Sequence, residues 1–132
     1  MLVRLRAAAD VGEAAWHLAR AVVMVRTKTF AKARPGLLAA DAAPPPGPEQ
    51  LRVQRAVRRA GRLVPGTTCL SEGVAAKRIL LARGYGADLH VGVRQGEGGK
   101  TEAHAWLACG TAVVTGGPPE KIARYTVIDV IR

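Results

Sequence analysis

Two residues of this chain carry side chains suited to nucleophilic catalysis. Cys69 stands at the start of a predicted helix, in the segment Pro-Gly-Thr-Thr-Cys-Leu at 65–70, and His104 lies in the strand-like segment Ala-His-Ala-Trp-Leu at 103–107. The unpaired N–H groups and the dipole of a helix N-terminus favour a thiolate, and an imidazole can serve as its base. The pair therefore predicts a thiol nucleophile with a general base.

Hydrophobic periodicity predicts the elements that position these two residues. Helices are expected at 1–26, at 48–63, and from Thr67 or Thr68, either of which can cap the helix, to Arg83. Strands are expected at 87–94, 101–108, 111–115 and 125–131. Cys69 would then lie in the first turn of the third helix and His104 in the second strand. The order predicts an α+β domain, with the cysteine helix packed on a small antiparallel sheet.

A proline-rich segment divides the front of the chain. Consecutive prolines exclude a helix, so 42–48 is interpreted as a linker between an N-terminal helical extension at 1–41 and a catalytic domain at 49–132. The first helix is expected to turn one apolar face inward. That face would contain Leu2, Leu5, Val11, Ala15, Leu18, Val22 and Val25.

A hairpin predicts what faces the histidine. If Cys109 and Gly110 form a two-residue turn, His104 lies opposite Thr115 on the neighbouring strand, and Trp106 shares its face. The imidazole would then point toward the helix that carries Cys69. Trp106 would be a core residue or a wall of the cleft that contacts substrate.

Composition limits the possible classes of protein. The 132 residues suffice for one core, and two cysteines are too few for a disulfide framework. Aromatic residues make up 4% of the chain, which disfavours the stacking platforms of single-strand nucleic-acid binders. Neither a signal peptide nor a membrane-spanning run is visible, so a reducing cytoplasm is the expected compartment.

A metal site and a nucleotide site are both disfavoured. The candidate metal ligands, Cys69, His90, His104 and Cys109, show none of the short spacings typical of zinc sites. The glycines of the 95–100 stretch do not lead from a strand into a phosphate-binding helix. No metal and no cofactor are therefore expected.

Positive charge is concentrated in the front half of the chain. Residues 1–68 hold 12 Lys and Arg against 4 Asp and Glu, a net charge of +8 out of a total of +10. Such a surface suits an acidic partner, a nucleic acid or an anionic membrane face, although the arginines also fall at the spacing of solvated helix faces.

The motifs together resemble one family, the lasso peptide leader peptidases, which are transglutaminase-like B2-type maturation proteins. The resemblance rests on four segments in order, at 65–70, 79–84, 89–94 and 103–107, and covers about residues 50–132. It implies a papain-like core and a cysteine peptidase that removes the leader of a ribosomally made precursor. It also implies two partners, a leader-binding protein (a RiPP recognition element) and an ATP-dependent lasso cyclase. Cys69 would be the nucleophile and His104 the general base and acid.

The third member of the catalytic group departs from the family pattern. The resemblance implies an aspartate on the strand after the histidine, yet 111–117 contains no carboxylate. Thr115, by its cross-strand position, is the first alternative. The others are Asp129, Glu120, Asp88 or no third group. A neutral partner would stabilise the imidazolium less than a carboxylate does.

The sequence thus predicts a cytoplasmic cysteine peptidase that acts on a lasso precursor. Two other classes stay open. One is a catalytically weak scaffold that presents the precursor to the cyclase, and the other is a basic nucleic-acid-binding module, although no nucleic-acid partner is expected.

Overall fold

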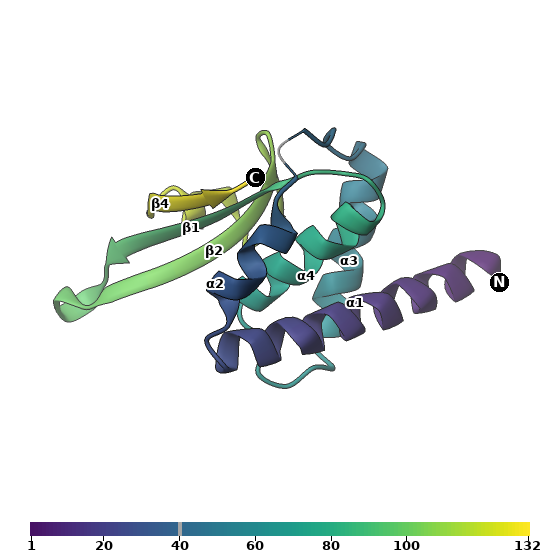
Figure 1. Ribbon diagram of the computed structural model, residues 1–132, viewed down its shortest axis with the longest axis horizontal. Coiled ribbons are helices and arrows are strands. Elements are labelled where there is room, and N and C mark those ends of the chain that lie inside the picture. Colours follow the sequence, from purple (N-terminus) through teal and green to yellow (C-terminus); the bar gives the residue numbers. More distant parts are fainter. Residues whose placement is uncertain (40) are drawn as a thin grey trace.

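The chain folds into a helical half followed by a sheet half (Figure 1). The computed structural model describes residues 1–39 and 41–132; residue 40, within the predicted N-terminal extension, lies outside the described residues. The helices are α1 (Leu2–Arg26), α2 (Phe30–Ala33), η1 (Arg34–Leu37), α3 (Gly47–Gly61), α4 (Cys69–Ala82), η2 (Glu97–Gly99) and α5 (Pro119–Ile122). The strands are β1 (Asp88–Gln95), β2 (Thr101–Cys109), β3 (Ala112–Thr115) and β4 (Thr126–Ile131). The predicted α+β class is confirmed.

The four strands form one antiparallel sheet in the order β3-β2-β1-β4. Leu89, Leu107 and Ile131 lie side by side in the register and are fully buried in the core that the sheet shares with α4. The residues of β1 and β2 that alternate with them, including Trp106 and His104, lie on the other face. The sheet therefore separates an aliphatic core from a second, aromatic face.

Helix α1 belongs to the same core as the helices that follow it. Leu18 and Ala21 are fully buried and pack in one cluster with Val57 of α3 and Ile79 of α4. Figure 1 shows α1 lying beside α4, with its N-terminal turns extending past the rest of the fold. The division of the chain at 42–48 into an extension, a linker and a catalytic domain remains a prediction.

The predicted inward face of α1 is partly wrong. Leu18 and Val22 are buried as expected, but Leu2 and Leu5 are exposed because the first turns have no neighbour to cover them. Asp10, which is not part of the predicted apolar face, is only 8% exposed. It faces α3, where it meets a guanidinium group.

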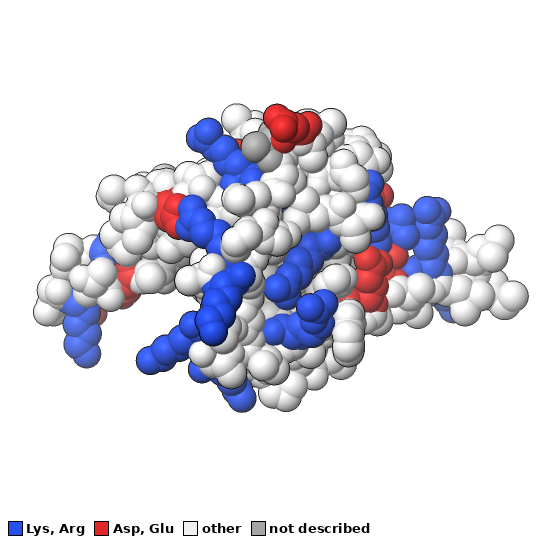
Figure 2. All heavy atoms as spheres, viewed as in Figure 1, with Lys and Arg blue, Asp and Glu red and all other residues white. Residues whose placement is uncertain are grey.

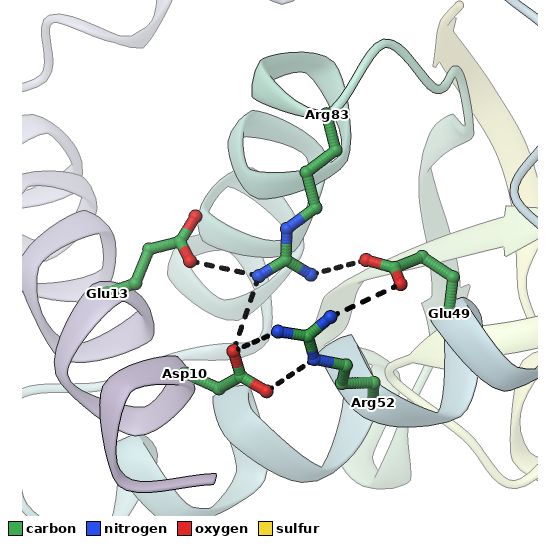
Figure 3. A network of polar contacts seen from close by, with 5 residues as sticks. All are labelled: Asp10, Glu13, Glu49, Arg52 and Arg83. Atoms are coloured by element: carbon green, nitrogen blue, oxygen red, sulfur yellow. Dashed lines mark hydrogen bonds and ion pairs between the residues drawn. The ribbon is translucent and has the colours of Figure 1, made fainter. Parts of the chain in front are cut away.

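An ion network of five residues joins α1, α3 and the end of α4 (Figure 3). The carboxylate of Asp10 accepts two hydrogen bonds from Arg52, at 2.6 and 2.7 Å. Arg83, which caps the C-terminus of α4, reaches Glu13 at 2.9 Å and also Glu49. Because each arginine meets carboxylates from more than one helix, the network fixes how the three helices sit together.

In the described part of the chain, no helix is both long and apolar enough to cross a membrane.

Replacing Asp10 with asparagine should lower the free energy of unfolding by about 1–3 kcal/mol at neutral pH, because Arg52 loses its carboxylate in a partly buried position. The hydrogen bonds from Arg52, aided by nearby arginines, hold the pKa of Asp10 below its ordinary value. Its stabilising effect is thus present above the ordinary pKa and is lost as the pH falls through the lowered one.

Urea unfolding of Asp10→Asn and wild type should therefore show the largest difference near pH 7 and a shrinking difference below about pH 3. Glu102→Gln, which removes an exposed pair with Arg94, is the control and should change stability much less. An equal difference near pH 7 and below about pH 3 would contradict a stabilising role of the ionised Asp10 carboxylate.

Candidate active site

The start of α4 is fixed by a reciprocal cap. Thr68 Oγ1 accepts a hydrogen bond from the backbone N–H of Ser71 at 3.2 Å, and Ser71 Oγ accepts one from the backbone N–H of Thr68 at 2.8 Å. This arrangement confirms Thr68 as the cap and makes Cys69 the first residue of the helix. The thiol therefore lies at the end where backbone N–H groups and the helix dipole favour negative charge.

A backbone group of the sheet meets the Cys69 sulfur. The N–H of Ala105, on β2, donates to Cys69 Sγ over an N–S distance of 3.4 Å. The donor lies past the point where β3 ends, because the last paired residue of β3, Thr115, is opposite Leu107. Cys69 is thus held at the open edge of β2, against Ala105, the residue that follows His104 in sequence.

His104 is held by a backbone carbonyl. Its Nε2 lies 2.7 Å from the carbonyl oxygen of Gly116, and its side chain is almost completely buried. A carbonyl can only accept, so Nε2 carries the proton and Nδ1 keeps its lone pair. The hydrogen bond therefore selects the tautomer in which Nδ1 is free to take a proton.

Aromatic rings fix the orientation of the imidazole. The rings of His104 and Tyr125 have centroids 5.1 Å apart, and those of His104 and Trp106 are 5.9 Å apart. Trp106 stacks in turn on His90, with centroids 5.4 Å apart and an angle of 1° between the planes. This packing limits rotation of the His104 ring about its side-chain bonds.

The predicted hairpin register is wrong. Cys109 pairs with Ala112, so the turn lies at Gly110 and residue 111, one residue later than expected, and Gly110 adopts the positive φ that the turn requires. A register shift between Leu107 and Ala108 then brings Thr115 opposite Leu107 and not opposite His104. The expectation that His104 points toward the body of α4 is also wrong, because Leu107 and Leu89 occupy that face; His104 shares with Cys69 the cleft at the open edge of β2.

Thr115 makes no hydrogen bond to His104. Its Oγ1 is buried and has no hydrogen-bond partner, and it lies over Gly73 of α4. The other predicted partners are elsewhere: Asp129, on β4, binds Arg34 and lies two strands away from β2, and Glu120 is exposed on α5. Asp88 begins β1 opposite Ala108, at the far end of the pair from His104.

The two cysteines lie in different surroundings. Cys109 ends β2 beside the buried Lys77, and burial raises the pKa of its thiol, which disfavours the reactive thiolate. Trp106 is 5% exposed within the aromatic cluster and is not part of the cleft wall. In the described residues, no group of three or more potential metal ligands lies close together.

An open cleft of about 770 Å³ brings Cys69 and His104 to one surface. Its walls come from α3, from the start of α4, and from the segment 111–119, which includes Thr115 and Gly116. Three charged residues also line it: Arg58, Lys121 and Glu72. Burial raises the pKa of Glu72, against an opposing effect of Arg58.

The groups that sequence reasoning missed are backbone atoms. The N–H of Ala105 and the carbonyl of Gly116 have no side-chain signature. The one available signal was the pair Gly116 and Gly117 directly after a short strand, which marks a backbone that must approach its neighbours closely. An added Cβ at Gly116 would lie 2.6 Å from the carbonyl oxygen of Ala105.

The helix-start thiol, the strand histidine and the antiparallel sheet define a transglutaminase-like arrangement, and comparison with known families agrees. The model of the transglutaminase-like superfamily matches residues 2–130, so the chain belongs to this superfamily, whose members are often cysteine peptidases or acyltransferases. No curated protein and no solved structure matches the chain.

Gly116→Ala should destabilise the protein by about 2 kcal/mol or more, because the φ of +87° and the contact with β2 both exclude a Cβ. It should also release His104 from its tautomer, which ¹⁵N shifts of the ring nitrogens report. Gly117→Ala is the control, since a Cβ there meets only Val113 at an ordinary 3.5 Å. An unchanged tautomer in a folded Gly116→Ala protein would contradict the role of the carbonyl.

Thr115→Val should leave stability unchanged or raise it by up to about 1 kcal/mol, because it removes a buried hydroxyl that has no partner and keeps the side-chain shape. Urea unfolding measures the difference. A clear loss of stability would mean that the hydroxyl makes a hydrogen bond in solution.

Proposed function

We propose that the protein is a cysteine peptidase in which Cys69 is the nucleophile and His104 the general base and acid. The observation that carries the proposal is the hydrogen bond from Ala105 N–H to Cys69 Sγ, because it places the thiol beside the strand residue that precedes Ala105. The shared cleft and the superfamily membership support the same assignment.

The chemistry is acyl transfer from a peptide amine to water. Nδ1 of His104 takes the thiol proton, and the Cys69 thiolate attacks the carbonyl carbon of the scissile bond. The backbone N–H of Cys69, unpaired in the first turn of α4, can donate to the oxyanion that forms. The C–N bond then breaks as His104 returns the proton to the leaving amine, and a thioester remains on Cys69.

The second half of the reaction uses the same groups. His104 takes a proton from water, and the resulting hydroxide attacks the thioester carbonyl. The C–S bond breaks, the carboxylic acid leaves, and the proton returns to the Cys69 sulfur. The hydrogen bond from Ala105 stabilises this sulfur whenever it is negative.

The Gly116 carbonyl takes the place of the third catalytic residue in this proposal. It orients the imidazole and selects its tautomer, as a carboxylate would, but carries no full charge to balance an imidazolium. This arrangement supports a competent but slow enzyme, or one whose site a partner completes.

The substrate proposed is the precursor of a lasso peptide, cut between leader and core in the cytoplasm. The proposal rests on the resemblance of the segments at 65–70, 79–84, 89–94 and 103–107 to leader peptidases. It carries with it two partners, a leader-binding protein and an ATP-dependent lasso cyclase.

Incubation of the protein with a precursor and a leader-binding partner, followed by mass spectrometry, tests the activity. The wild type should release the leader, Cys69→Ala should abolish release, and His104→Ala should reduce it by about a thousandfold or more. Cys109→Ala is the matched control and should keep full activity. Precursor left intact under every partner combination would contradict the peptidase, and cleavage by Cys69→Ala would contradict its mechanism.

A further inference from the structure

Helix α3 carries a line of arginines on its outer face. Arg55, Arg58, Arg59 and the C-cap residue Arg62 follow the spacing of a single helix face, and all four are exposed, while Val53 and Val57 turn inward. In the described residues none of the four forms an ion pair, whereas Arg52 on the same helix binds Asp10. We call these four residues the α3 arginine line.

The α3 arginine line connects two hollows of the surface. Arg58 lines the cleft that contains Cys69. Arg55 and Arg59 line a groove of about 590 Å³ between α1 and α3, where Val3 and Leu51 supply apolar surface. Two carboxylates, Asp10 and Glu49, also line this groove, and both are paired with arginines of the ion network. A ligand that occupies the cleft can therefore extend over α3 and remain in contact with the α3 arginine line.

Positive charge alone does not single out this helix. Figure 2 shows Lys and Arg gathered over the middle of another face, where Figure 1 places α2 and α4 in front. What distinguishes the α3 arginine line is its continuity with the cleft. Glu72 lines the cleft together with Arg58, and burial raises the pKa of this carboxyl group.

We propose that the α3 arginine line binds an acidic segment of the peptide substrate, next to the bond held in the cleft. The proposal rests on the peptidase function and adds a preference for Asp or Glu near that bond. From Arg55 to Arg62 the helix rises about 10 Å, which an extended peptide covers in about three residues. Two or three acidic side chains on a short peptide segment therefore suffice to contact the α3 arginine line.

A peptide fits this surface better than a nucleic acid does. A single-strand binder needs aromatic rings between its cations, and the α3 arginine line has none. Its groove offers aliphatic side chains, which suit the apolar residues of a peptide.

Binding can be measured without cleavage in the Cys69→Ala background. The probe is a fluorescein-labelled peptide rich in glutamate, and its control is the same peptide with every glutamate changed to glutamine. Arg55→Gln, Arg59→Gln and Arg62→Gln together should weaken binding of the acidic peptide about five- to tenfold and hardly change the control peptide. Thermal unfolding verifies that the variant is folded.

A matched variant removes the same charge elsewhere. Arg20, Lys32 and Lys100 are exposed and lie outside both the cleft and the groove, and their combined change to glutamine should weaken binding less than about twofold. Equal weakening by both variants, or by neither, would overturn the proposal. So would tighter binding of a single-stranded oligonucleotide that depends on the same three arginines.

The activity assay separates this proposal from the peptidase function. With an acidic substrate that is cleaved, the triple arginine variant should raise KM and leave kcat unchanged, because these contacts are equal in the ground and transition states. An unchanged KM would overturn the proposed role of the α3 arginine line without contradicting the peptidase function. Selective binding of the acidic peptide with no cleavage would contradict the peptidase and leave the line as a binding site.

Discussion

The hydrogen bond between Ala105 and Cys69 is the interaction on which the arrangement of the candidate site depends. It is a contact between the helical half and the sheet half, and it forms only if α4 begins at residue 69 and β2 has an open edge. The first condition is met by the cap of Thr68 and Ser71, and the second by the early end of β3 at Thr115. The packing of α1 and α3 against α4 holds the helix in place while these local conditions are satisfied.

A protein that orients a histidine with a carbonyl uses partial charge where a carboxylate would use a full one. The two differ little in how they direct a ring, since both accept one hydrogen bond in a fixed direction. They differ in how strongly they stabilise an imidazolium in a buried site. Here the ring lies among Trp106 and Tyr125, whose π faces add weak attraction for a cation. The site is therefore better built for positioning than for charge stabilisation.

Much of the fold could be predicted from local signals. Thr68 and Gly84 mark the limits of α4, and alternating residues mark the strands, because these effects act over a few positions. The register of β3 could not be predicted, since the shift at Leu107 depends on packing between distant segments. The burial of Asp10 depends likewise on Arg52, 42 residues later. Within the site, residue types pointed to Cys69 and His104, but the groups around them are peptide atoms, which every residue possesses.

The use of backbone atoms around Cys69 and His104 affects how relatives of this protein would be recognised. A hydrogen-bond acceptor supplied by a main-chain oxygen has no side chain of its own, so it leaves no conserved polar residue for an alignment to find. A survey that requires an acidic residue after the histidine would classify such a chain as a degenerate, inactive copy. The feature to look for is instead the backbone conformation at Gly116, which requires a residue without a side chain. Glycines in the loop after the third strand would then separate working members from true pseudoenzymes.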